Sequence, residues 1–258
     1  MNIGFFGGTF DPVHRGHLAL ARAGLEQCKL HRIHFVPANI PPHKQRQPLS
    51  PFVHRFAMLA LATAAEKAFV PSLLEAPEEG AGPDRTGSRT SSRRTKDGSE
   101  KPNYTIDTLR RLREHLQPTD ELFFLLGADS FLTLRRWHNC TELLLFCNFI
   151  VAGRPGFSLE QINASLPKGV QNTGEARAAG FTRFTLAGPS GQSTELFLLP
   201  DLDQDISATE IRAALAEGSE LETVLAPSVA EYIRSHGLYR ASRDTIETAG
   251  KVGKSKEI

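Results

Sequence analysis

The stretch from residue 7 to residue 17 constrains the fold of this chain most strongly, because it reads as a junction between a strand and a helix. It spells Gly-Gly-Thr-Phe-Asp-Pro-Val-His-Arg-Gly-His and follows the short apolar run 3–6. A glycine pair after a strand allows a tight turn that brings backbone N–H groups against an anion. Apolar residues recur at helical spacing over 18–28, which places His14 and His17 at the start of an amphipathic helix. Because the helix dipole favours negative charge there, the junction predicts a phosphate site.

Strand and helix patterns alternate after this junction. They comprise a second strand over 32–37, a helix over 52–67 with Phe52, Phe56, Leu59 and Thr63 on one face, a helix over 104–116 and a third strand over 121–126. This alternation predicts an α/β fold whose parallel sheet is covered by helices on both faces. Ligands of such sheets bind outside the carboxyl ends of the strands.

Three loops follow predicted strands and should therefore gather at one edge of the sheet. They are the glycine pair 7–8, the Pro-Pro-His-Lys segment 41–44 and the Gly-Ala-Asp segment 127–129. We expect them to build a single pocket.

Two segments have a composition unlike the rest. Residues 76–102 are rich in Gly, Ser, Thr, Arg and Glu and hold no aliphatic residue larger than alanine, which predicts an exposed, disordered insertion. Its arginines could instead contact a polyanion, but interleaved acidic residues largely offset them. The polar tail 241–258 is expected to be mobile. The remainder, 1–240, is expected to form one domain.

The second half of the chain holds a further strand over 148–152 and a hairpin formed by 181–186 and 195–199. After it, Ser207 and Glu210 match a capping box at the start of another helix. The N-terminus of that helix offers a second set of N–H groups to an anion.

Composition favours a small-molecule enzyme. The 258 residues, 40% of them hydrophobic, suffice for one sizeable core, and a net charge of +1 gives no electrostatic reason to expect nucleic acid or a membrane as partner. Met1 leads directly into the first strand, so we expect a cytoplasmic protein.

Cys28, Cys140 and Cys147 lie in apolar segments without Cys-x-x-Cys spacing, which predicts buried free thiols. His34, His43 and His54 lack companions at ligand spacing, so no protein-bound metal is expected.

The His-x-Gly-His junction resembles the signature of the nucleotidylyltransferase superfamily with the (T/H)xGH motif. That resemblance implies a Rossmann-like doubly wound parallel sheet with a helical C-terminal part. It also implies that His14 and His17 contact the α-phosphate of a nucleoside triphosphate. Further loop contacts to ATP are assigned to Gly7, Gly8, Thr9, Phe10 and Gly16.

A second segment resembles the ISSTxIR signature of the same superfamily, which binds the β- and γ-phosphates. The matching residues are Ile206, Ser207, Thr209 and Arg212. Ala208 stands where the signature has its second serine, which removes at most one hydrogen bond of about 0.5–1.5 kcal/mol. Arg212 is expected to act with the two histidines in catalysis.

A series of motifs between these two signatures resembles the bacterial nicotinate mononucleotide adenylyltransferases. The motifs are residues 35–39, 41–44, 104–109, 127–130, Trp137 and 154–156. The resemblance covers roughly 1–70, 101–157 and 205–239. The resemblance implies transfer of AMP from ATP to nicotinate mononucleotide in NAD biosynthesis, with Mg²⁺ arriving on the ATP. In that family the loop at Tyr104 and Thr105 donates backbone N–H groups to the nicotinate carboxylate, and the tryptophan matching Trp137 stacks on the pyridine ring. Asn103 replaces the usual serine before the tyrosine. Packing in the core, on a helix continuing to Leu144, is the alternative for Trp137.

The remaining assignments place Lys44 on a substrate phosphate, Asp129 on a ribose or adenosine group of ATP, and Arg154 with the second substrate. Alternatives are adenylyl or cytidylyl transfer to another acceptor, such as nicotinamide mononucleotide or phosphopantetheine. A nucleotide-binding regulator without catalysis is a further alternative. The sequence leaves the oligomeric state open, a homo-oligomer included.

Overall fold

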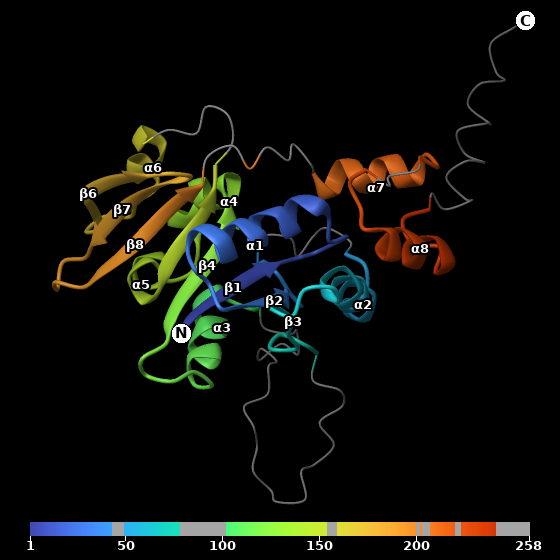
Figure 1. The fold of residues 1–258 in the computed structure, drawn as a ribbon, viewed down its shortest axis with the longest axis horizontal. Coiled ribbons are helices and arrows are strands. Elements are labelled where there is room, and N and C mark those ends of the chain that lie inside the picture. The colour runs from blue at the N-terminus through green and yellow to red at the C-terminus, as the bar shows by residue number, and fades with distance from the viewer. Residues whose placement is uncertain are drawn as a thin grey trace, which may run out of the picture.

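The computed structural model describes residues 1–42, 49–77, 102–153, 159–199, 202, 207–219 and 223–240. Eight strands form one sheet in the order β3-β2-β1-β4-β5-β8-β7-β6 (Figure 1). The strands are β1 (Asn2–Gly8), β2 (Arg32–Pro37), β3 (Phe69–Pro71), β4 (Glu121–Gly127), β5 (Asn148–Ala152), β6 (Gln171–Ala178), β7 (Phe181–Ala187) and β8 (Ser193–Leu199).

Helices connect and cover these strands. They are α1 (Arg15–Gln27), α2 (Phe52–Thr63), α3 (Thr105–Arg113), α4 (Ala128–Thr133), α5 (Cys140–Phe146), α6 (Leu159–Ser165), α7 (Ala208–Ala216) and α8 (Pro227–Ser235), with a short 3₁₀ helix η2 (Leu134–Arg136). In Figure 1, α8 lies beside α2, α7 lies at the same end of the molecule, and β6 and β7 lie at the opposite end.

The predicted parallel sheet is confirmed for six neighbouring strands, in the order β3, β2, β1, β4, β5 and β8. The predicted hairpin is confirmed as β7 and β8, which pair antiparallel, and it carries one more antiparallel strand, β6. β6 was missed because it forms an exposed edge strand, so its residues show no alternation of apolar and polar side chains.

Two hydrophobic cores lie on the two faces of the sheet, as the alternation of side chains along β1 requires. Phe6 joins a core with Leu18 of α1 and Ile233 of α8. Its neighbour Phe5 points to the other face, where it joins a core with Ile106 of α3. Helices therefore cover both faces of the sheet, and the ends of its parallel strands are left for the connecting loops.

The predicted helix 52–67 ends earlier, at Thr63, and its buried face differs from the prediction. Leu59 and Thr63 are buried as expected, but Phe52 and Phe56 are only half-buried. Arg55 takes a buried position instead, because its guanidinium donates to backbone carbonyl groups of the adjoining loops.

Several sequence predictions concern residues outside the described part of the chain. These are nearly all of the insertion 76–102 and the whole tail 241–258. The division into one domain and a tail stays a prediction.

Candidate active site

A cleft of about 1350 Å³ opens at the carboxyl ends of β1, β4 and β5. This volume exceeds the roughly 300–1,000 Å³ of most single-ligand sites, so the cleft can hold two nucleotides. The three predicted loops meet there, as expected: its lining includes Gly7, Gly8, Pro41, Pro42, Gly127, Ala128 and Asp129. His43 and Lys44 of the second loop lie outside the described residues.

The two histidines of the first motif line the cleft together. His14 is the N-cap of α1, and His17 lies three residues further, in the first turn. Their ring centroids lie 3.7 Å apart with the ring planes tilted by 32°, and the Phe10 ring packs against His17 with centroids 5.0 Å apart. The sequence prediction that both histidines begin the helix is confirmed.

A backbone contact fixes the tautomer of His17. The N–H of His14 donates to Nδ1 of His17 at 3.2 Å. Since a backbone N–H can only donate, Nδ1 must be the acceptor, and a neutral His17 carries its proton on Nε2. His17 therefore carries a ring N–H at Nε2, a group from which a phosphoryl oxygen can accept a hydrogen bond.

His14 lies in a drier environment. Only 9% of the residue is exposed, and burial lowers its pKa from 6.5 to about 4, so the imidazole is neutral at pH 7. Among the described residues its Nδ1 has no hydrogen-bond partner. A buried polar atom of this kind is costly unless a ligand or water satisfies it.

The glycine loop lies close to its aromatic neighbours. A side chain at Gly7 would place its Cβ 2.9 Å from the Phe5 ring, so the buried Phe5 ring would have to move to admit it. Phe10, assigned to ATP binding from the motif, is buried in the core with its ring 5.5 Å from that of Phe6. Thr9 and Gly16 line the cleft.

Arg55 binds the backbone of this loop, a role that was not recognised from the sequence. It is 2% exposed, and its guanidinium donates to the carbonyl oxygens of Thr9 (2.8 Å), Ala38 (2.7 Å) and Ser50 (2.9 Å). It therefore joins the ends of β1 and β2 to the start of α2. An arginine within a mostly apolar helix was the available signal.

The second phosphate motif begins α7. Ser207 is the N-cap, as predicted, but its Oγ accepts from the N–H of Thr209 (3.2 Å), so the predicted capping box with Glu210 is wrong. An N-cap side chain can accept from the backbone N–H of either the second or the third helical residue, which here are Thr209 and Glu210. Ser207 and Ala208 line the cleft, and Ile206 lies outside the described residues.

Arg212 connects the two phosphate motifs. Its guanidinium donates from Nη1 to the carbonyl oxygen of Asp11 at 2.7 Å and from Nη2 to Oγ1 of Thr209 at 3.4 Å. Motifs that lie about 200 residues apart in the sequence are thus in direct contact, because the hydrogen bond to Asp11 spans 201 positions.

The other end of the cleft is aromatic. Tyr104 is the N-cap of α3, and its ring stacks on His138 with centroids 4.1 Å apart. Trp137 lines the cleft beside them and packs on Phe124. Trp137 follows η2 and lies outside α5, so the expected continuous helix to Leu144 is wrong. His138 was not identified from the sequence.

Asn103 has a clear role at this end. Its N–H donates to the carbonyl oxygen of Ile40 and its Oδ1 accepts from the N–H of Ile40, both at 3.0 Å. The reciprocal pair fastens the loop after β2 to the loop before α3. The N–H groups of Tyr104 and Thr105, at the start of the helix, have no intrahelical acceptor.

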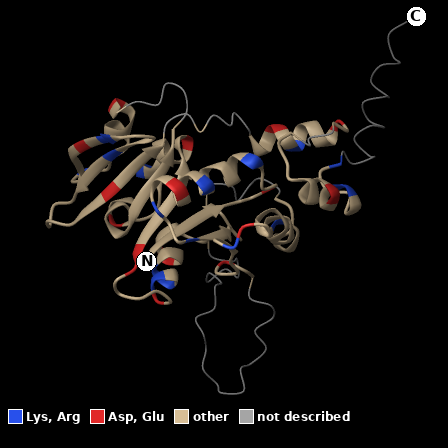
Figure 2. Cartoon of the chain, viewed as in Figure 1, with Lys and Arg blue, Asp and Glu red and all other residues tan. Residues whose placement is uncertain are grey.

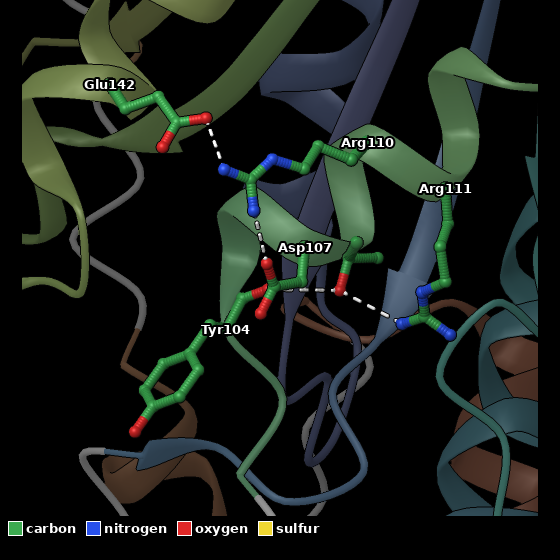
Figure 3. A network of polar contacts seen from close by, with 6 residues as sticks. Tyr104, Asp107, Arg110, Arg111 and Glu142 are labelled. Atoms are coloured by element: carbon green, nitrogen blue, oxygen red, sulfur yellow. Dashed lines mark hydrogen bonds and ion pairs between the residues drawn. The ribbon is translucent and has the colours of Figure 1, made fainter. Parts of the chain in front are cut away.

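Charged contacts hold α3 in place (Figure 3). Arg110 bridges Asp107 and Glu142 of α5, and the Tyr104 ring points away from this network. On the other side of the helix, Arg111 donates to the carbonyl oxygen of Leu74 at 2.7 Å. The aromatic end of the cleft is therefore anchored to two neighbouring segments.

A buried carboxylate also lines the cleft and was missed. Glu75 is 5% exposed, and its Oε1 accepts from the Oγ1 of Thr108 at 2.6 Å. Asp129, in the first turn of α4, is exposed and lines the cleft as expected. Arg154 lies outside the described residues.

Elsewhere the charges are mixed in sign. Figure 2 shows basic and acidic residues interspersed along the described helices and strands.

In the described part of the chain, no group of three or more His, Cys, Asp or Glu could hold a metal ion. Nor is any described helix long and apolar enough to cross a membrane. All three cysteines are free, but Cys140 is half-buried, so its predicted full burial is wrong.

Comparisons with known proteins agree with this geometry. A family model described as cytidylyltransferase-like matches residues 5–214. A protein of Laribacter hongkongensis named "Probable nicotinate-nucleotide adenylyltransferase" is 40% identical over 240 residues, covering 93% of this chain and 94% of its own. The chain belongs to the nicotinate-nucleotide adenylyltransferase family. A relative of the same name from Pseudomonas syringae pv. tomato is 37% identical, and the match covers 93% of this chain and 94% of the relative.

A solved structure extends the comparison to the fold. Plasmodium falciparum nicotinic acid mononucleotide adenylyltransferase, complexed with NaAD, superimposes with a TM-score of 0.61 and 20% identity. The match covers 92% of this chain and 97% of that one. The doubly wound nucleotidylyltransferase fold predicted from the sequence is confirmed.

Proposed function

We propose that this enzyme transfers AMP from ATP to nicotinate mononucleotide, giving deamido-NAD and pyrophosphate in NAD biosynthesis. One observation carries the proposal: a single cleft joins the histidine pair at the start of α1 to the aromatic residues at the start of α3. A triphosphate at the first end and a pyridine ring at the second bring the two reacting phosphates together between them.

The reaction needs positioning and charge stabilisation more than acid–base chemistry. A phosphate oxygen of the mononucleotide attacks the α-phosphorus of ATP, the bond from that phosphorus to the bridging oxygen breaks, and pyrophosphate leaves. The attacking phosphate is already ionised at neutral pH, so no general base is required. We assign His17, through its Nε2–H, and His14 to the α-phosphate oxygens, which become more negative in the transition state.

The second phosphate motif is assigned to the β- and γ-phosphates. Ser207 and Thr209 begin α7, where the helix dipole favours negative charge. Arg212 adds a full positive charge that stabilises the departing pyrophosphate. Mg²⁺ is the proposed cation; it would arrive bound to the triphosphate and neutralise part of the charge on the leaving group.

Recognition of nicotinate is assigned to the start of α3 and to Trp137. The N–H groups of Tyr104 and Thr105 would donate to the carboxylate, which accepts them better than an amide can. The Trp137 face provides a platform for the flat pyridine ring. The Asn103–Ile40 pair holds these donors in place.

A pyrophosphate-release assay with ATP, Mg²⁺ and one acceptor at a time tests the proposal. We expect rapid release with nicotinate mononucleotide and slower release with nicotinamide mononucleotide. No release with either acceptor would contradict the assigned reaction. A preference for the amide would keep the reaction and reject the proposed role of Tyr104 and Thr105.

A Trp137→Ala variant tests the aromatic platform. We expect its KM for nicotinate mononucleotide to rise about tenfold, equivalent to about 1.4 kcal/mol, with KM for ATP nearly unchanged. Phe146, half-buried on α5, gives a control position where Phe146→Ala should leave both KM values near those of the wild type.

A further inference from the structure

Asp11 is a buried carboxylate in the middle of the first phosphate motif, and the reaction described above gives it no task. It is 1% exposed. Its Oδ2 accepts from the N–H of Ser50 at 3.1 Å, and its Oδ1 accepts from the Tyr239 hydroxyl at 2.5 Å. Its backbone oxygen accepts from Arg212 at 2.7 Å. Of these three partners, Ser50 and Tyr239 bind the carboxylate itself and offset the cost of burying its charge.

Two of those partners come from the C-terminal segment. Tyr239 and Arg212 both reach the same residue of the glycine loop, one through a side chain and the other through the backbone. Burial and the bond to Asp11 raise the pKa of the Tyr239 phenol, so it stays a hydrogen-bond donor. The loop is thus held at one point by the residue that follows α8 and by the phosphate-binding arginine of α7.

The backbone on both sides of this contact is strained. Phe10, next to Asp11, has φ 48°, and Tyr239 has φ 62°. Residues with side chains rarely adopt this left-handed region, and such strain persists only where surrounding contacts enforce it. The conformations of the loop and of the C-terminal segment are therefore fixed together.

Attachment of the C-terminal segment does not by itself require Tyr239. The N–H of Arg15 donates to the carbonyl oxygen of Val224 at 2.9 Å, and the Tyr232 hydroxyl contacts Nδ1 of His54 at 3.0 Å. Val229 and Ile233 of α8 are buried in the core. Tyr239 differs from these contacts because its hydroxyl binds Asp11, the residue whose backbone oxygen also accepts from Arg212.

We propose that Asp11 and Tyr239 form a latch that positions Arg212 against the glycine loop, so that the two phosphate motifs keep the spacing that a triphosphate requires. Tyr239 is a positioning residue in this proposal, which rests on the proposed function because the latch serves the ATP half of that site. Loss of the latch should weaken ATP binding and turnover, and should not affect recognition of the mononucleotide.

The test compares Tyr239→Phe with Tyr232→Phe. Each variant removes one hydroxyl between the C-terminal segment and the body of the protein, but only the first hydroxyl reaches the loop. Binding of a non-hydrolysable ATP analogue is measured by calorimetry, and KM is measured separately for ATP and nicotinate mononucleotide. We expect Tyr239→Phe to weaken analogue binding about tenfold while KM for the mononucleotide stays within about twofold. Tyr232→Phe should lower the Tm but leave analogue binding within about twofold.

A double-mutant cycle identifies the route of the effect. In an Arg212→Ala background, Tyr239→Phe should weaken analogue binding by less than about twofold further, because the residue it positions is gone. Three results would each overturn the latch: a full tenfold effect in that background, equal effects of the two tyrosine variants, or a parallel change in both KM values.

If Tyr239→Phe folds poorly, Asp11→Asn, which keeps one acceptor oxygen, should weaken analogue binding about threefold. An Asp11→Asn affinity equal to that of the wild type would likewise overturn it.

Calorimetry separates this proposal from the assigned reaction. Analogue binding needs no acceptor, so a latch effect without turnover on nicotinate mononucleotide would reject only the assigned acceptor. Turnover without a latch effect would reject only the latch. A wild-type protein that binds no analogue would overturn the latch, because no triphosphate site would be there to position.

Discussion

His14 and His17 have different electrostatic environments although they lie in one helical turn. His14 is buried, with a pKa lowered to about 4, whereas His17 is half-buried and has its tautomer fixed by a backbone N–H. The motif predicts that both contact a phosphate. It does not distinguish the neutral, dry imidazole from the one whose Nε2–H is prepared to donate.

Replacing His17 by Ala should lower turnover about 10²–10³-fold, because the lost donor acts on charge that develops in the transition state. Steady-state rates measured with saturating ATP and nicotinate mononucleotide check this, with the Tm as control for folding. Turnover close to the wild-type value would contradict the assigned role of His17.

Burial of His14 should make the protein sensitive to acid. Its pKa is about 4 in the folded state and 6.5 ordinarily, so between these values the unfolded chain binds more protons and stability falls as pH falls. The loss should reach about 2 kcal/mol near pH 5 and be absent above about pH 7. Urea unfolding at the two pH values measures it.

A His14→Asn variant lacks this titrating group and should lose about 2 kcal/mol less on the same change of pH. His115, an exposed residue beyond the end of α3, offers a matched control. His115→Asn should follow the wild type at both pH values. An identical acid response of the His14→Asn variant would show that His14 is not the sensitive group.

Among the helices, α1 carries the histidines and must lie close against the sheet. Gly24 makes this approach feasible: a Cβ there would lie 3.3 Å from side-chain carbons of Leu30 and Leu125. Gly24→Val should therefore push α1 outward, lower the free energy of unfolding by about 1–3 kcal/mol and reduce turnover. Thermal unfolding and steady-state kinetics measure both effects. Glu26→Val, on the exposed face of α1, should change either quantity little.

The longer buried strands were predictable from sequence, whereas the exposed strand β6 and the helices α4, α6 and α8, which also bury side chains, were not predicted individually. β1, β2 and β5 are dense in apolar residues, and for the last two the predicted bounds are those observed. β6 was missed because almost all its side chains are exposed, and β3 because it has three residues. Strand pairing determines both of these strands, and pairing leaves no local pattern in the sequence.

The same limit applies to the candidate site. The motifs and the family resemblance indicated the histidines, Trp137 and Arg212, to which we assign the chemistry. Arg55 and Asp11 were assigned no contacts because their partners are backbone groups and residues distant in sequence. Long-range hydrogen bonds of this kind become visible only when the fold brings the segments together.

For the molecule as a whole, removal of residues 78–100 should leave the reaction intact. Their sequence offers no aliphatic side chain larger than alanine with which to join a core, and a shorter connection costs little entropy. We expect a deletion variant to retain KM for nicotinate mononucleotide within about twofold, as measured by pyrophosphate release. A rise above about tenfold, or 1.4 kcal/mol, would assign the segment to the mononucleotide pocket.

The contact between Asp11 and Tyr239 joins positions 228 residues apart. Because a ribosome adds residues from the N-terminus onward, the emerging chain displays its glycine loop and histidines long before Arg212 and Tyr239 have been made. Any stabilisation that ATP lends to the fold depends on binding the folded form. During synthesis the nucleotide can therefore contribute little to assembly of the nascent sheet, and cellular ATP should protect the protein from degradation most strongly after residue 239 has left the ribosome.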